Sequence, residues 1–390
     1  MSGIIHITKR RNLLYVIYLM TSYFLRKVDL IIIKANYTFN DSLLFTFLML
    51  FGELVGGLPI FIYQRYFFST GEIKKIKYLG IELIQETSTI NRRDSILKMI
   101  LLIFFTAYFD FVEFVIATFY MPKYTALSPT AETRFGGGII IITALICHFI
   151  LKIKILKHQF YSLIIIGICL IIIIIPEILV QSKDVSFGEF LVSHLLILGY
   201  LVFMAMTDVV EKYLIEFNFL NPFFILTFES IFGFILIGIY SAGENPFKDI
   251  KRIYGESSAG EFALLLFLLF LYFIFSAGIN IYKVLINGLF SPMVKTLSVY
   301  ILNPIIFIYY FIIGYDFLYE GERNWLYFIV NIIISIIISF FGCVFNEFLV
   351  LSCCGLDYET HTTVSKRAAK DKLNKSITLL DDLTDDTSEI

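Results

Sequence analysis

Long apolar segments, separated by short polar loops, run from about Asn12 to about Glu347. A helix needs about 20 apolar residues to cross the roughly 30 Å hydrocarbon core of a bilayer. Ten segments of this length predict membrane-spanning helices at about 12–34, 43–63, 97–119, 130–151, 160–180, 190–213, 222–241, 262–283, 293–313 and 325–347. The pattern therefore predicts an all-α integral membrane protein with ten transmembrane helices.

The apolar runs lack the alternation that is typical of membrane β-strands. The stretches LIIIGICLIIIII and LYFIVNIIISIIISFF show no polar residue at every second position. A helix satisfies each backbone polar group within its own segment, as lipid requires. Composition agrees, because 58% of residues are hydrophobic and 16% are charged, whereas soluble domains carry about 25% charged residues. We expect the soluble parts to be minor.

Basic residues in the loops indicate the orientation. If the N-terminus is cytosolic, the cytosolic loops and tail hold twenty Lys and Arg residues, and the opposite side holds seven. This bias follows the positive-inside rule. An even number of spans then places both termini in the cytosol. Lys212 and Lys283 are counted here among the cytosolic loop residues.

Ten spans divide into two groups of five, which predicts an internal inverted repeat. A five-helix unit duplicated in tandem inserts with opposite orientation, and many secondary transporters are built in this way. Glu53 and Glu229 occupy corresponding second and seventh spans. The predicted units are a cytosolic N-terminus, a first repeat, a second repeat and a disordered cytosolic tail, at 1–11, 12–180, 181–357 and 358–390.

Arg134 and Lys295 are the strongest candidates for substrate binding. Each lies shortly after a Ser-Pro pair that opens a predicted helix, at Ser128-Pro129 and Ser291-Pro292. Helix N-termini present free N–H groups and partial positive charge, so an added cation there favours anion binding. The alternatives are an ion pair of Arg134 with Glu132, or cations that reach the headgroups.

Polar residues inside other spans form a second set of candidates. Charge within a membrane is costly and often marks a transport pathway. Asp110 and Glu113 lie three residues apart, on one face of a helix. With Glu53 and Glu229 they are candidates for proton coupling or charge balance, and Asn280 is a candidate polar contact. The alternative is a structural role as counter-charges or as hydrogen bonds between helices. Asp29, Asp208 and Glu211 lie nearer span ends and are expected to reach water.

Signatures of soluble catalysis are absent from the chain. It contains no HExxH, Walker loop, GxSxG elbow or convincing GxGxxG motif, and its intramembrane histidines are dispersed. We therefore predict no catalytic residues, no metal ligands and no cofactor, and we do not expect an enzyme.

A resemblance to a known family follows from several stretches. The segment from Asp110 through SPTAETRFGGGIIIITALICHFILKIKILKHQFYSLIIIGICLIII resembles the third to fifth spans of the drug/metabolite transporter superfamily, also called EamA-type. DVVEKYL, FESIFGF, SPMVKTLSVYILNPI and NEFLVLSCCGL extend the similarity to about residues 12–356. Within the superfamily the chain is most similar to the F-type branch of the solute carrier 35 family. The resemblance implies a ten-helix inverted-repeat carrier of an endomembrane such as Golgi, endoplasmic reticulum or a lysosome-like organelle, and it does not specify the substrate.

The preferred interpretation is a secondary transporter of a small organic solute, of anionic type, that works by alternating access. Its partners are the solute, the lipid bilayer and either a coupled proton or a counter-substrate, with no nucleic acid. The pattern leaves a homodimer open. The main alternative is a non-transporting membrane scaffold or receptor. A lipid-modifying enzyme would need clustered His, Asp or Cys, and a channel would need a filter or pore loop; neither pattern is evident.

Overall fold

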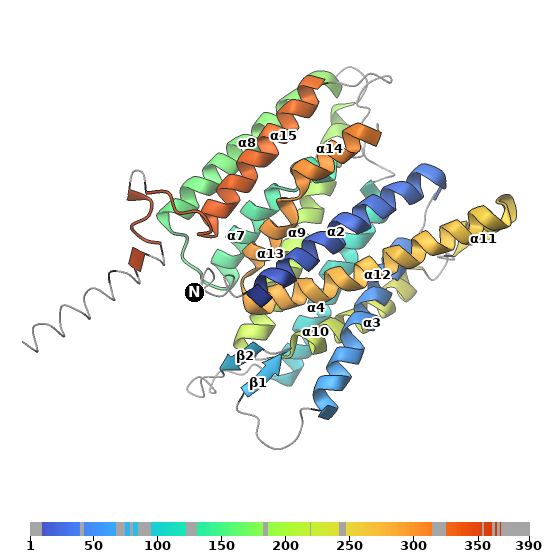
Figure 1. Cartoon of the computed structure of the whole chain (residues 1–390), viewed down its shortest axis with the longest axis horizontal. Coiled ribbons are helices and arrows are strands. Elements are labelled where there is room, and N and C mark those ends of the chain that lie inside the picture. Colours follow the sequence, from blue (N-terminus) through green and yellow to red (C-terminus); the bar gives the residue numbers. More distant parts are fainter. Residues whose placement is uncertain are drawn as a thin grey trace, which may run out of the picture.

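Helices form nearly all of the secondary structure of the chain (Figure 1). The computed structural model describes residues 10–39, 43–67, 75–78, 81–84, 95–121, 131–181, 186–218, 220–241, 247–313, 325–352, 355–360, 363–364 and 367. The predicted N-terminal segment up to residue 9 and most of the predicted tail after residue 357 lie outside the described residues.

Every predicted span coincides with a helical segment. The bounds are α2 (Arg10–Asn36), α3 (Leu44–Phe67), α4 (Ile96–Val115) continued by the π-helix η2 (Ile116–Tyr120), α6 (Ala131–Phe135), α7 (Gly138–Ile150), α8 (Lys157–Gln181), α9 (Phe187–Phe217), α10 (Pro222–Tyr240), α12 (Ala259–Leu289), α13 (Pro292–Tyr300), α14 (Asn303–Ile313) and α15 (Trp325–Phe345). Local sequence explains several starts. Ser186 and Ser258 form capping boxes with the glutamates three residues later, and Asn221 caps α10 ahead of a proline.

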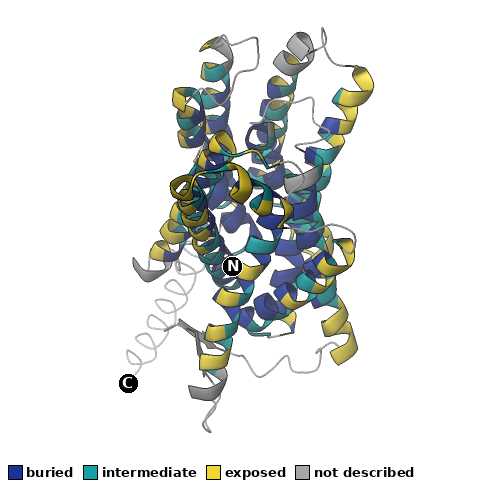
Figure 2. Cartoon of the chain, turned by 90° about the vertical axis from the view of Figure 1, so that its right-hand side faces the viewer, coloured by how far each residue is buried: buried dark blue, intermediate teal, exposed yellow. Residues whose placement is uncertain are grey.

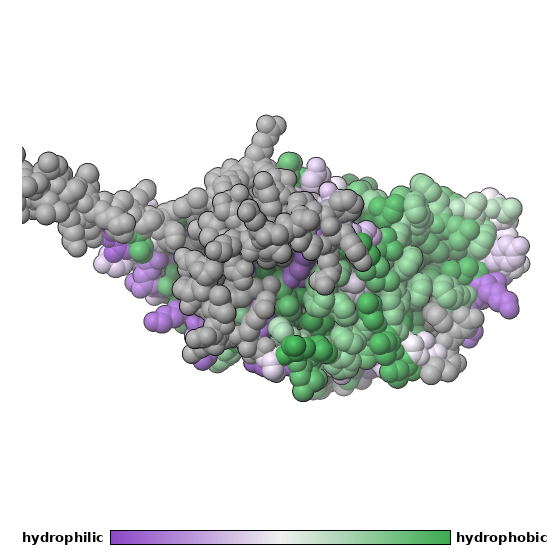
Figure 3. All heavy atoms as spheres, turned by 90° about the horizontal axis from the view of Figure 1, so that it is seen from below, coloured by the Kyte–Doolittle hydropathy of each residue, from purple (hydrophilic) through white to green (hydrophobic). Residues whose placement is uncertain are grey.

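Seven helical stretches among the described residues are long and apolar enough to cross a bilayer, and they make the chain a multi-pass membrane protein. They lie in α3, α8, α9, α10, α12, the α13–α14 pair and α15. Of the remaining predicted spans, α2 and α4 carry more charge within their length, and α7 is shorter. Figure 2 shows exposed residues along the outer faces of the helices and buried residues inside. Much of the surface in Figure 3 is apolar, as lipid contact requires.

The connecting segments contain secondary structure of their own, and one span is longer than predicted. The 64–96 segment contains an antiparallel hairpin of β1 (Lys75–Tyr78) and β2 (Ile81–Ile84). The 242–261 loop contains a short helix, α11 (Lys248–Glu256). The eighth span does not end at residue 283, because α12 continues to Leu289.

Two of the helical spans are interrupted. The first break separates α6 from α7 at Gly136 and Gly137, and the second separates α13 from α14 just before Asn303. The two breaks meet, because the Asn303 side-chain amide donates a hydrogen bond of 2.9 Å to the backbone oxygen of Thr133. A Cβ on Gly137 would lie 3.1 Å from the Ile338 side chain, which would have to shift slightly to admit it.

Packing between helices defines the order of the bundle. α12 packs on α2 and α3, and α4 packs on α9 and α10. α3 also packs on α10, α8 on α15 and α7 on α13 (Figure 1). The contact of α3 with α12 is close at Gly52, where an added Cβ would lie 2.9 Å from the backbone nitrogen of Ala277. Small residues permit this approach of helix backbones.

Candidate functional site

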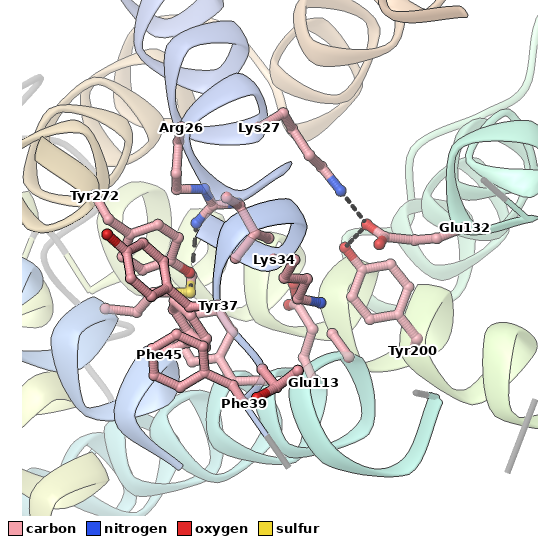
Figure 4. Close-up of a pocket in the computed structure, with 15 residues that line it drawn as sticks. Arg26, Lys27, Lys34, Tyr37, Phe39, Phe45, Glu113, Glu132, Tyr200 and Tyr272 are labelled. Carbon is pink, nitrogen blue, oxygen red and sulfur yellow. Dashed lines mark hydrogen bonds and ion pairs between the residues drawn. The ribbon is translucent and has the colours of Figure 1, made fainter. Parts of the chain in front are cut away.

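A cavity of about 370 Å³ lies between six helices of the bundle (Figure 4). Residues of α2, α3, α4, α6, α9 and α12 line it, so segments from both ends of the chain contribute. The charged lining residues are Arg26, Lys27, Lys34, Glu113 and Glu132, and the aromatic ones are Tyr37, Phe39, Phe45, Phe114, Tyr200 and Tyr272. We call this space the cavity.

Two cations of the cavity have no acidic partner among the described residues. The Arg26 guanidinium donates only a weak hydrogen bond of 3.4 Å to the sulfur of Met49. Lys34 is exposed and makes no described hydrogen bond or ion pair. A forked guanidinium with free donors is well suited to a carboxylate or phosphate. The cavity therefore offers unsatisfied positive charge to an anion.

The third cation is held by an acid on another helix. Lys27 Nζ lies 2.9 Å from Glu132 Oε1, and the Tyr200 hydroxyl donates to the same oxygen at 3.2 Å. These contacts join α2, α6 and α9 at one wall of the cavity (Figure 4). The Glu132 carboxylate thus neutralises Lys27, and Arg26 and Lys34 are the cations of the cavity without a described ion pair.

The cavity extends inward from one end of the bundle. Tyr37 follows the last turn of α2, and its hydroxyl donates a 2.7 Å hydrogen bond to the backbone oxygen of Glu261 in the first turn of α12. Lys34 lies near this end, and Arg26 lies eight residues earlier in α2, which corresponds to about 12 Å along a helix. We infer that Lys34 lies at the mouth and Arg26 further in.

A set of buried charged residues lies deeper in the bundle than the cavity. Lys283 of α12 is eleven residues beyond Tyr272, about 16 Å further along the helix from the mouth. Its ammonium group lies 3.1 Å from Glu211 Oε1 and 3.4 Å from Asp110 Oδ1. The Glu211 contact is an ion pair by distance, although its angle does not satisfy a hydrogen bond.

A second lysine extends this charged region to α13. Lys295 Nζ lies 2.6 Å from Asp208 Oδ2, and both side chains are buried. The Asn287 amide donates 2.7 Å to Glu211 Oε2 and 3.4 Å to the backbone oxygen of Asp208. α9, α12 and α13 are thereby joined by charged and amide side chains.

Glu53 and Glu229 complete the charged region from α3 and α10. They are 1% and 3% exposed. The Glu53 carboxyl lies within hydrogen-bonding range of the Asp110 carboxyl, and the Glu229 carboxyl lies beside the hydroxyl of Thr106. Both also face Lys283. We call the acids of this region the carboxylate cluster: Glu53, Asp110, Glu113, Asp208, Glu211 and Glu229.

Burying these charged side chains away from water costs free energy, so each needs a partner of opposite charge. Each ion removed from water costs several kcal/mol, and attraction between partners offsets this cost only when the geometry is good. Removing one partner of a buried pair typically costs about 3–5 kcal/mol. The lysines that hold the carboxylate cluster are therefore essential to the stability of this packing.

The structure gathers most of the sequence-predicted site residues into one region. Asp110, Glu53, Glu229 and Lys295 all lie in or beside the carboxylate cluster, and none of them lines the cavity. Glu113 belongs to both, because it lines the cavity and interacts electrostatically with Asp110, Lys283 and Lys295.

Arg134 and Asn280 lie apart from the cavity lining. Arg134 is 1% exposed and is packed in α6, and Asn280 is buried in α12. The alternative pairing of Arg134 with Glu132 finds no support among the described contacts, since Glu132 pairs with Lys27. The proposed anion role of Arg134 and Lys295 stays a prediction.

Several residues were placed wrongly from the sequence. Lys283 and Lys212 were counted as loop cations but are buried in helices, which lowers the cytosolic count from twenty to eighteen. Lys212 Nζ donates 2.9 Å to the backbone oxygen of Phe290 just after α12. Asp29, Asp208 and Glu211 were expected to reach water, but all three are buried.

The residues of the cavity were largely missed for a physical reason. Arg26 and Lys27 are visible as charges inside the first span, but hydropathy does not tell which side of a helix faces the protein. Tyr200 and Tyr272 resemble ordinary apolar positions until their helices are packed together.

Comparisons with known proteins give no further guide. No protein-family model matches the chain, and no curated protein matches it.

Within the part of the chain that the structure describes, no three His, Cys, Asp or Glu side chains are arranged to hold a metal ion.

Proposed function

We propose that the protein is a secondary transporter of a small organic anion, working by alternating access across an endomembrane. The observation that carries this proposal is the cavity, in which Arg26 and Lys34 lack acidic partners among the described residues. An unbalanced guanidinium in a membrane protein is costly unless a ligand or water meets it. A bound carboxylate or phosphate satisfies that requirement.

The tyrosines of the cavity suit an organic anion better than a bare ion. Tyr200 and Tyr272 face the space from α9 and α12, and Phe45 packs edge-on against Tyr272 with ring centroids 5.2 Å apart. Aromatic side chains supply apolar area together with a polar tip. Pockets with apolar walls and few polar groups are typical of small-molecule sites.

The order of helix packing supports two five-helix halves. In an inverted repeat, each span of the first half corresponds to the span five places later in the second half. Under this correspondence the contact of α2 with α12 matches the contact of α9 with α4. The contact of α3 with α12 likewise matches the contact of α10 with α4. The pairs α3–α10, α8–α15 and α7–α13 map onto themselves. The interrupted spans α6–α7 and α13–α14 also correspond. This pattern is expected of an inverted repeat of ten transmembrane helices.

The cavity lies where two such halves meet. α2, α3, α4 and α6 belong to the first half, and α9 and α12 belong to the second. Beyond the cavity, the ion pair of Asp110 with Lys283 joins α4 of one half to α12 of the other. We propose that the mouth at Lys34 is one access route and that the charged region around Lys283 closes the opposite route. Rocking of the halves would exchange these states.

The loop charges favour a mouth on the side away from the cytosol. Lys34 belongs to the less basic side in the predicted orientation, with both termini cytosolic. The resemblance to EamA-type carriers, and within them to the F-type branch of the solute carrier 35 family, agrees with this proposal. The proposal includes coupling to a proton or a counter-substrate, and it leaves a homodimer open.

Reconstituted uptake tests the proposal. Full-length protein in liposomes is given nucleotide sugars, nucleotides, amino acids and organic acids, and uptake is compared with protein-free liposomes. We expect saturable uptake of at least one anion and a strong loss in Arg26→Ala. Arg367→Ala, outside the bundle, is the matched control and is expected to transport normally.

Two results would redirect the proposal. Uptake that is unchanged in Arg26→Ala would move the anion site away from the cavity. No uptake of any panel compound by folded protein would favour the scaffold or receptor function, and the partners of the tail would then be sought.

A further inference from the structure

We propose that the carboxylate cluster is a proton-binding site and that Glu113 exchanges its proton with the cavity, so that anion entry is linked to proton uptake. The linkage to anion entry rests on the proposed function. The proton site itself does not, because it follows from the arrangement of buried side chains.

The first argument is the imbalance of charge. The carboxylate cluster has six acids, and the cations among its described contacts are Lys283 and Lys295. The acids come from α3, α4, α9 and α10, and the lysines from α12 and α13. Lys212 lies on α9 as well, but its ammonium is engaged by Glu216 at 2.8 Å and by the backbone oxygen of Phe290 at 2.9 Å. Two ammonium groups cannot balance six carboxylates away from water, so neutral carboxyls are required.

The second argument is the geometry of individual oxygens. Glu53 Oε2 and Glu229 Oε1 are buried and accept no hydrogen bond from any described residue. Glu53 instead places its carboxyl against that of Asp110. Two carboxyls at this range are compatible when a proton lies between them, as one becomes a donor. The buried oxygens without donors therefore point to bound protons.

Glu113 connects this proton site to water. It lines the cavity, and it lies three residues from Asp110 on the same face of α4. The π-helix η2 begins three residues after Glu113, and its Ala117 also lines the cavity. π-helical turns are frequent at functional sites. A proton from cavity water can reach a Glu113 carboxylate oxygen, and the cluster lies directly behind it.

Linkage with an anion follows from charge. A negative ligand held by Arg26 lies in the same cavity as Glu113, so it favours the neutral form of that carboxyl. By reciprocity, a protonated Glu113 favours the bound anion. The structure thus predicts uptake of a proton together with the anion, rather than exchange of the two.

Infrared spectroscopy of purified full-length protein tests the proton site without a transport assay. At neutral pH the wild type is expected to show the C=O stretch of protonated carboxyls, and the band is expected to shrink in Glu53→Gln and in Glu229→Gln. Glu189→Gln is the matched control, because Glu189 caps α9 at an exposed position, and it should leave the band unchanged. Transfer of the protein into D₂O should shift the band, and Glu113→Gln should slow that shift severalfold.

Each outcome decides the proposal. A wild type with no protonated-carboxyl band overturns it, and so does a band that both cluster variants leave intact. A D₂O shift of unchanged rate in Glu113→Gln removes Glu113 as the exchange point. If the bands behave as expected but no anion is taken up by liposomes, the proton site stands and the proposed transport function fails.

Benzenesulfonate is a suitable probe of the linkage, because it carries an aromatic ring and stays ionised at every accessible pH. Calorimetry in two buffers of different ionisation enthalpy gives the protons taken up per anion bound. We expect proton uptake in the wild type and none in Glu113→Gln. Binding without proton uptake in the wild type, or no binding at all, overturns the linkage and leaves the infrared result to decide the proton site.

Discussion

The cavity and the carboxylate cluster use charge in opposite ways. In the cavity, cations outnumber the acids that pair with them, and Arg26 contacts only a methionine sulfur and the ring of Tyr23. In the carboxylate cluster, negative charge is in excess, and both lysines lie within 3.4 Å of an acid. The first region is open at one end of the bundle, and the second is closed beneath it.

The contrast teaches which charges can meet a solute and which hold the bundle together. A cation that lines a cavity can bind a ligand at little structural cost. A cation such as Lys283, buried among acids, is needed to keep those acids in place. The role of a charged residue therefore depends more on its position within the packing than on its residue type.

Removal of Lys283 is expected to have the largest effect. Lys283→Met leaves Asp110 and Glu211 without their ammonium partner and should lower the free energy of unfolding by about 3–5 kcal/mol. Thermal unfolding in detergent measures the change. Lys154→Met, at an exposed loop position, is the control.

A second substitution sharpens this test. Adding Glu211→Gln to Lys283→Met removes an unpaired acid and should recover part of the lost stability, because the two side chains interact directly. If Lys283→Met unfolds at the same temperature as the control, the carboxylate cluster does not depend on its lysine.

Loss of Arg26 is expected to affect transport more than stability. Hydrogen bonds to charged groups contribute about 1.5–3 kcal/mol, so Arg26→Ala should weaken anion uptake about 10- to 100-fold. Saturation kinetics in liposomes measure this loss. Arg134→Ala serves as the comparison, and a larger loss in Arg134→Ala than in Arg26→Ala would restore the sequence-based site.

Removing the acidic partner of Lys27 is expected to strengthen anion binding. Glu132→Gln removes the carboxylate that pairs with Lys27 and leaves a third free cation in the cavity. Anion affinity should rise about threefold to tenfold, the equivalent of one modest hydrogen bond. Tyr200→Phe, which removes only the hydroxyl contact to Glu132, is the control. Weaker anion binding in Glu132→Gln would show that the pair positions the cavity wall instead.

Charge at the mouth is expected to matter least. Lys34 is exposed, so Lys34→Ala should reduce the initial rate of uptake only a fewfold, as exposed charges contribute about 0.2–1 kcal/mol. The difference should vanish near 1 M salt, where the screening length is about 3 Å. A deficit that persists at high salt would mean that Lys34 contacts the anion directly.

Hydropathy predicted where the helices lie, because a bilayer demands about 20 apolar residues for each crossing. It did not predict that α12 continues past Lys283, since a lysine near a span end looks the same whether it faces water or a buried acid. It could not predict the cavity either. The cavity arises where α2 meets α9 and α12, and contacts between residues so distant in sequence leave no local pattern.

The candidate site could likewise be predicted from the sequence only in part, because hydropathy does not show which side chains meet. Charges such as Glu53 and Glu229 stood out because any acid within a span is unusual. Their shared neighbour Lys283 was hidden by its place at the edge of an apolar run. Arg26 was visible as a charge, yet its lack of an acidic partner is a property of packing alone.

One measurement tests the joint action of the two regions most directly. Liposomes with wild type or Glu113→Gln are given the panel anion that shows saturable uptake, with and without a proton gradient. We expect a gradient to drive accumulation of the anion in the wild type, whereas Glu113→Gln exchanges the anion at equilibrium but no longer accumulates it. Equal accumulation in both proteins, or no accumulation in the wild type, would contradict the linkage of proton and anion.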